Sequence, residues 1–180
     1  MFKDFNIDSL KKMKPRSDNS FDTMMEIKEL TKIPLNKKFV KENDDIEARF
    51  KSVAKKNNIK DYDPKLVAVL IKTSAPVILR LKKHFDRPRP KVIAKKMNIK
   101  MKDIEMDSMK TPSYPSGHSV QGRLIAKILG DKHPNAKNAF AKTGDDISYS
   151  RRVARAHYKS DSKMGEKMGD MMYEHVKNKI

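Results

Sequence analysis

Apolar residues recur every three or four positions along most of the chain, as they do in helices that bury one face. Segments in which apolar and polar residues alternate, the pattern of a half-buried β-strand, are scarce. The pattern therefore predicts an all-α fold, in the form of a single-domain helical bundle. The expected helices lie at residues 21–32, 44–56, 65–85, 119–129, from 133 onward, and 161–177.

The segment 65–85 is the most apolar of these helices, and we expect it to be the central core helix. Its start is marked by Asp63, whose side chain can cap free amides, and by Pro64, which fits the first helical position. Asp22 is the expected cap of the helix at 21–32. Gly130 is the expected stop of the helix at 119–129, since glycine commonly follows the last helical residue.

The remaining segments are assigned by their composition. Residues 1–20 are predicted to be an N-terminal lead-in, and residues 21–180 a single helical domain. Residues 87–111 are expected to form a long connection with at most a short helix, which in a small domain is often functional. The C-terminal segment is rich in methionine, and at helical spacing these side chains are expected to fill a core face.

Composition limits the functions that the chain can have. With 180 residues it is long enough for one domain with a hydrophobic core, and 41 Lys and Arg against 23 Asp and Glu give a formal charge of +18. Such a surface attracts phosphates, nucleic acids and anionic membranes. The absence of cysteine excludes disulfides, thiolate catalysis and cysteine metal sites.

No apolar stretch is long enough to span a membrane, and the first 20 residues lack the apolar centre of a secretory signal. We therefore expect a cytoplasmic location.

Three separated clusters carry the candidate chemistry. In the first, Pro88 and Pro90 disfavour helical conformation at the residues before them, so Lys82 is expected in the last helical turn and Arg89 on an extended exit. Two cations fixed in this way can converge on one anion. The alternative is that these basic residues only complement the negative end of the helix dipole.

The second cluster is the run from Pro115 to His118. Ser116 and Gly117 precede a predicted helix, whose free amides can bind an anion, and glycine lets a ligand approach the backbone. His118 is placed to give a proton to a leaving group. The alternative is an ordinary Pro-Ser-Gly turn followed by a histidine at the start of a helix.

The third cluster contains Arg151, His157 and Asp161. If residues 157 and 161 are helical, their side chains share one face, and Asp161 can bond one imidazole nitrogen while the other stays free as a nucleophile. The six-residue step from Arg151 to His157 predicts a break or turn between them. The alternative is a simple surface pair of little energetic value.

Taken together, the motifs Lys-x6-Arg-Pro, Pro-Ser-Gly-His and Ser-Arg-x5-His-x3-Asp resemble those of the type 2 phosphatidic acid phosphatase superfamily. This superfamily includes the bacterial class A non-specific acid phosphatases and the vanadium-dependent haloperoxidases. The resemblance extends over residues 82–161 and implies an enzyme with its active site at one end of the core helices. Lipid-phosphate members of the superfamily usually have six membrane helices, and because this chain has none, it resembles the soluble branch with the class A acid phosphatases.

The resemblance also implies a role for each motif residue. His157 is expected to take the phosphoryl group as a phosphohistidine, Asp161 to orient it, and His118 to act as general acid. The phosphate-binding residues are expected to be Lys82, Arg89, Ser116, Gly117 and Arg151. Neither a metal ion nor another cofactor is expected.

Hydrolysis of phosphate monoesters, with phosphate or vanadate able to enter the pocket, is the favoured function, and the expected partner is a small phosphorylated substrate. One alternative is a vanadate-dependent haloperoxidase with His157 as the axial ligand. Another is a basic nucleic-acid-binding protein without catalysis. Contact with an anionic membrane or nucleic acid, and assembly into a homo-oligomer, are left open by the sequence.

Overall fold

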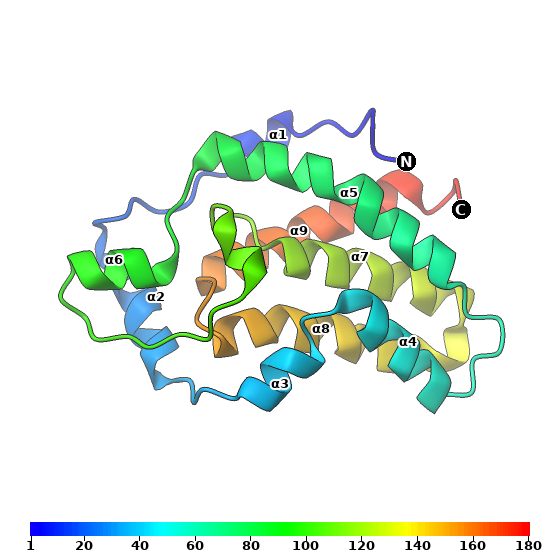
Figure 1. The fold of residues 1–180 in the computed structure, drawn as a ribbon. Coiled ribbons are helices and arrows are strands. Elements are labelled where there is room, and N and C mark those ends of the chain that lie inside the picture. Colours follow the sequence, from blue (N-terminus) through cyan, green and yellow to red (C-terminus); the bar gives the residue numbers. More distant parts are fainter.

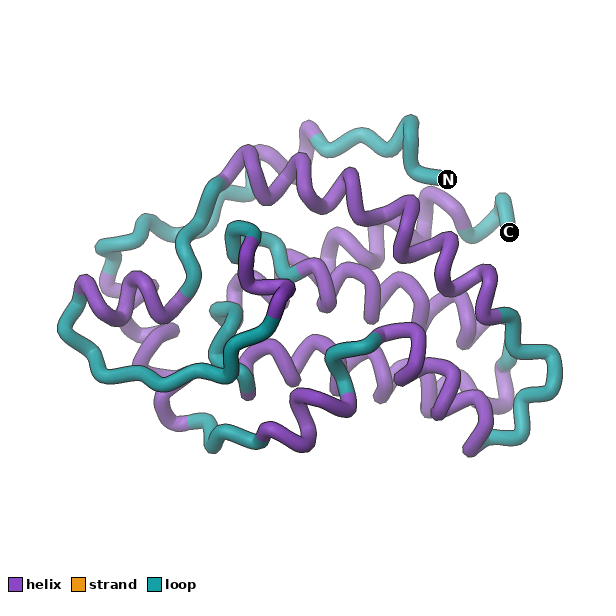
Figure 2. Tube along the Cα trace, in the orientation of Figure 1, coloured by secondary structure: helices purple, strands orange, loops and turns teal.

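The structure, a computed structural model, describes residues 1–180 and consists of helices and loops without any strand (Figure 2). The α-helices are α1 (Asp8–Lys11), α2 (Phe21–Lys32), α3 (Lys37–Glu42), α4 (Ile46–Lys56), α5 (Pro64–Phe85), α6 (Pro90–Lys96), α7 (Gly117–Lys132), α8 (Lys137–Val153) and α9 (Lys159–Val176). Two short 3-10 helices are η1 (Asp107–Lys110) and η2 (Pro134–Ala136). The all-α prediction is confirmed.

Helix α7 is the centre of the packing, because it contacts α5, α8 and α9 (Figure 1). Buried apolar side chains from all four helices belong to one main hydrophobic cluster, in which Met164, Met168 and Met172 of α9 take part. The prediction that the methionines fill a core face is therefore confirmed.

Two capping residues predicted from the sequence differ from those in the structure. Helix α2 has the expected bounds, but its cap is Ser20, whose side chain accepts from the Thr23 amide, and Asp22 lies inside the first turn. Helix α7 continues through Gly130, which has helical rather than left-handed backbone. Here the glycine makes room for a neighbour, since an added Cβ would lie 3.1 Å from the Lys137 side chain.

The N-terminal segment packs on the bundle. Phe2, Phe5, Ile7 and Leu10 are buried and belong to the main hydrophobic cluster. Helix α1 contacts α5, and the ring of Phe5 meets the ring of His175 in α9 edge to face. Packing is thus continuous across residue 20, where the lead-in was expected to end.

Four helix ends meet at the same end of the bundle: the C-termini of α5 and α8 and the N-termini of α7 and α9 (Figure 1). The approach of α9 to α7 depends on Gly165. A Cβ at this position would lie 2.6 Å from the Ser116 carbonyl oxygen and 2.8 Å from the Ser119 Cβ. Only glycine permits this distance, which brings the start of α9 beside the start of α7.

The Gly165→Ala variant is expected to lower the free energy of unfolding by about 1–3 kcal/mol, because the new methyl group overlaps backbone that cannot move aside. Denaturant unfolding measures the change. Gly130→Ala is the control, since its nearest neighbour is a flexible lysine side chain and alanine favours a helix. Equal stability of the two variants would contradict this interpretation of the helix contact.

Candidate active site

A pocket of about 230 Å³ opens where the four helix ends meet. Four of the predicted site residues line it: Lys82, Gly117, His118 and His157. Ala75, Ile78 and Leu79 of α5 form an apolar part of its wall.

His157 and Asp161 are in direct contact, although the first of them is not helical. Helix α8 ends at Val153 and α9 begins at Lys159, so the predicted break after Arg151 is present and His157 lies in the intervening loop. The Asp161 Oδ2 atom lies 3.2 Å from His157 Nδ1 and also accepts from the Tyr158 amide at 3.0 Å. Both side chains are buried.

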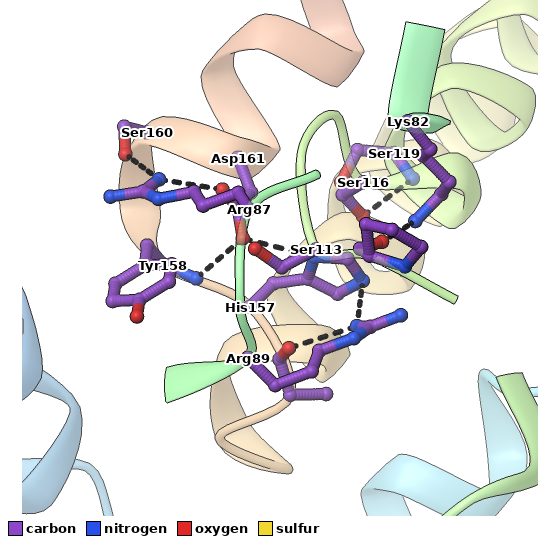
Figure 3. Close-up of polar contacts among 12 residues, drawn as sticks. Lys82, Arg87, Arg89, Ser113, Ser116, Ser119, His157, Tyr158, Ser160 and Asp161 are labelled. Carbon is purple, nitrogen blue, oxygen red and sulfur yellow. Dashed lines mark hydrogen bonds and ion pairs between the residues drawn. The ribbon is translucent and has the colours of Figure 1, made fainter. Parts of the chain in front are cut away.

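The hydrogen bonds of His157 define which nitrogen carries the proton. Arg89 Nη1 lies 2.8 Å from His157 Nε2 (Figure 3), and a guanidinium group can only donate. Nε2 is therefore unprotonated and accepts this hydrogen bond with its lone pair, and Nδ1 carries the hydrogen that is donated to Asp161. This is the tautomer that a nucleophilic Nε2 requires.

The guanidinium of Arg89 is held on all sides by backbone carbonyl groups. Arg89 has extended backbone at the start of α6, as predicted. Its Nε donates to the Thr111 oxygen, Nη1 to the Ala156 oxygen and Nη2 to the Ser108 oxygen, each at 2.9 Å. The long connection after α5 thus folds back over Arg89 and fixes it beside His157.

Lys82 and the start of α7 form the opposite side of the site. Lys82 is buried in the last turn of α5, as predicted, and its Nζ donates to the Pro112 oxygen at 2.5 Å. Ser116 caps α7, and its own amide donates to the Asp161 backbone oxygen at 3.0 Å. The amides of Gly117 and His118 occupy the first helical positions, which have no acceptor within the helix.

Arg151 and His118 meet at a residue that the sequence did not indicate, Asp44. Arg151 Nη1 donates to Asp44 Oδ1 at 2.8 Å, and His118 Nε2 lies 2.9 Å from the Asp44 backbone oxygen. Arg151 is 1% exposed, and its Nη2 is buried without a hydrogen-bond partner. An unpaired buried donor next to the pocket is suited to an anionic ligand.

Arg87 is a second residue missed from the sequence. It is 2% exposed, donates to Asp161 Oδ1 at 2.7 Å and stacks on the Tyr158 ring at 3.7 Å. Glu26 of α2 lies 3.3 Å from its Nη2. One signal was available, because Arg87-Pro88 repeats the pattern of Arg89-Pro90. Glu26 and Asp44 lie in segments without a readable motif.

Burial and the proximity of several cations shift the pKa values of the site residues. Burial lowers the pKa of Lys82 to about 7 and that of Arg89 to about 10. Burial, with the nearby Arg89, Lys82 and Arg151, holds the pKa of His157 well below its ordinary value. Burial raises the pKa of Asp161, and its ion pair with Arg87 opposes this effect. His157 is therefore neutral and lies among positive groups.

Two further findings concern the whole structure. It contains no grouping of three or more His, Cys, Asp or Glu side chains that could hold a metal ion. None of its helices combines the length and the apolar character that a membrane span requires.

The sequence is similar to those of known acid phosphatases over about half of its length. No model of a known protein family matches the chain. The non-specific acid phosphatase of Salmonella typhimurium is 34% identical over 88 residues, which are 49% of this chain and 35% of that protein. The acid phosphatase of Zymomonas mobilis is 33% identical over 100 residues, 56% of this chain and 38% of that protein. The matches thus cover little more than a third of these relatives.

The fold is similar to that of a solved structure over nearly the whole chain. A transmembrane PAP2-type phosphatidylglycerolphosphate phosphatase from Bacillus subtilis superposes with a TM-score of 0.61 and 17% identity. The alignment covers 99% of this chain and 96% of that chain. At this identity the likeness shows the fold.

Replacement of Arg87 by Leu is expected to destabilise the protein by about 3–5 kcal/mol, because it leaves the buried Asp161 without its ion-pair partner. Arg87→Lys keeps the charge and should recover part of this loss. Denaturant unfolding of both variants measures the effect. Arg16→Leu is the matched control, because Arg16 lies near Arg87 but is 72% exposed. A loss at Arg87 no larger than that at Arg16 would refute the role of the ion pair.

Proposed function

We propose that the chain, which has the sequence motifs and the fold of the type 2 phosphatidic acid phosphatase superfamily, hydrolyses phosphate monoesters through a phosphohistidine at His157. The observation that carries this proposal is the state of the His157 ring, whose Nε2 is unprotonated and lies among cations. The local similarity to acid phosphatases agrees with this reaction.

The phosphate group of the substrate is proposed to bind where the cationic side chains converge. Lys82, Arg89 and Arg151 neutralise its charge, while the Ser116 hydroxyl and the Gly117 amide donate hydrogen bonds. Charge-assisted hydrogen bonds of this kind become stronger in a buried site, where water does not compete.

In the first chemical step, the lone pair of His157 Nε2 forms a bond to phosphorus, and the bond between phosphorus and the ester oxygen breaks. His118 gives a proton to the departing oxygen, so that the alcohol leaves uncharged. Asp161 accepts the hydrogen bond from Nδ1 and stabilises the positive charge that develops on the ring.

In the second step, His118, now neutral, removes a proton from water as its oxygen attacks phosphorus. The bond between phosphorus and Nε2 breaks, inorganic phosphate leaves, and both histidines return to their starting states. The positive side chains supply the charge that metal ions provide in two-metal phosphatases. We therefore propose that the reaction needs no metal ion.

His157→Ala is expected to reduce hydrolysis of p-nitrophenyl phosphate to the buffer background, because no other group can accept the phosphoryl group. Release of p-nitrophenolate with a metal chelator present measures the activity. His84→Ala is the control, since His84 is exposed and makes no contact with the site residues. Vanadate, which mimics the five-coordinate transition state, should inhibit the wild type. Full activity of His157→Ala would rule out the proposed nucleophile.

We expect kcat/KM to be higher in acid solution than in alkaline solution. Since the pKa of His157 is lowered, its ring stays neutral and nucleophilic in mild acid. Burial also lowers the pKa of His118, so the general acid loses its proton in mildly acid solution as the pH rises. The pKa of Lys82 is about 7, so one phosphate-binding charge is lost as the pH rises through neutrality. A pH profile of the wild type tests this. Activity that rises steadily from pH 6 to pH 9 would contradict it.

A further inference from the structure

We propose that Asp44 is a positioning residue of this reaction, which holds the ring of the general acid His118 and is itself held by Arg151. The inference rests on the proposed function. It assigns a catalytic purpose to the turn between α3 and α4, which lies outside the three motifs.

The contacts of His118 show what Asp44 does to the ring. His118 Nε2 lies 2.9 Å from the Asp44 backbone oxygen and 3.4 Å from its Oδ1. Nε2 therefore carries a hydrogen that points at Asp44. Nδ1 is left as the ring nitrogen that can exchange a proton with the leaving group and with water. The Asp44 backbone oxygen thus occupies Nε2, and the Asp44 carboxylate places a negative charge 3.4 Å from the same nitrogen.

Asp44 is fixed in place, although its side chain is 44% exposed. Arg151 Nη1 donates to its Oδ1 at 2.8 Å, and Arg151 is almost completely buried. The preceding residue, Asn43, is also buried, donates to the Phe39 oxygen at 2.9 Å and accepts from Arg49 Nε at 3.0 Å. The turn between α3 and α4 is therefore held in place by the side-chain hydrogen bonds of both Asn43 and Asp44.

The same arrangement occurs at the nucleophile. There Arg87 donates to Asp161, which accepts from His157 Nδ1. Each of the two site histidines thus contacts an aspartate that an almost fully buried arginine holds. Because the two aspartates face opposite ring nitrogens, the nitrogen without a proton in the neutral ring is Nε2 in His157 and Nδ1 in His118.

The charges around His118 predict the effect of losing the carboxylate. The ring of His118 is surrounded by charged and titratable groups from four segments. These are Asp44 from the α3–α4 turn, Arg151 from α8, Lys82 from α5 and His157 from the loop before α9. Burial and Arg151 lower the pKa of His118, whereas the hydrogen bond to Asp44 raises it. Without the negative charge, less of the acid is protonated at any given pH.

The test compares Asp44→Asn with the wild type on two esters. An alkyl phosphate has a leaving oxygen that needs a proton, whereas p-nitrophenolate leaves with little help. For Asp44→Asn we expect kcat on the alkyl ester to fall about tenfold or more, a small change on p-nitrophenyl phosphate, and loss of activity at lower pH than in the wild type. Asp107→Asn is the charge-matched control, since Asp107 is 96% exposed and lines the neighbouring surface.

Two further measurements separate a positioning role from a structural one. Asp44→Asn added to His118→Ala should change the rate no further, because both act on the same proton. In an NMR titration of the ring protons, the pKa of His118 should be lower in Asp44→Asn than in Asp107→Asn. This second measurement does not require activity.

The inference is overturned if Asp44→Asn behaves like Asp107→Asn, if it slows both esters equally without moving the pH profile, or if its effect persists in His118→Ala. Failure of the proposed function looks different, because the wild type would then hydrolyse neither ester.

Discussion

The candidate site depends on burying several cations beside one neutral histidine. Burial of a charge is costly unless hydrogen bonds or an opposite charge compensate for it. Lys82 and Arg89 are compensated mainly by backbone carbonyl groups, and Arg151 by Asp44. These acceptors fix the cations in place, so the proposed phosphate site is formed before a substrate binds.

The fold brings these cations together because the termini of four helices meet at the same end of the bundle. The start of α7 provides the amides of Gly117 and His118, while the ends of α5 and α8 provide Lys82 and Arg151. Close contact between α7 and α9 at Gly165 sets the distance from Ser116 to the start of α9. Packing in the core therefore determines the geometry of the candidate site.

Local sequence patterns predicted much of this arrangement. Helical spacing and caps indicated α5 almost to the residue, and the prolines after Lys82 correctly predicted the extended backbone at Arg89. The His157–Asp161 contact was derived for the case in which both residues are helical, but it forms between a loop and the first turn of α9, because the chain turns after α8. Spacing alone does not distinguish these two geometries.

The missed residues share a physical reason. Arg87, Glu26 and Asp44 act through partners at least 60 positions away along the chain. No local pattern reveals Glu26 or Asp44, and the Arg-Pro pair at Arg87 does not indicate its partner. The buried core residues of the first segment were missed for the same reason, since Phe2 and Phe5 are buried only by packing against distant helices.

The most direct measurement is the chemical identity of the phosphorylated enzyme. Rapid mixing with p-nitrophenyl phosphate, followed by quenching in alkali and mass spectrometry of peptides, locates any covalent phosphate. The account predicts phosphate on His157, with more of it in His118→Ala, which lacks the base for the second step. Turnover without phosphate on His157, or with phosphate on another residue, would contradict it.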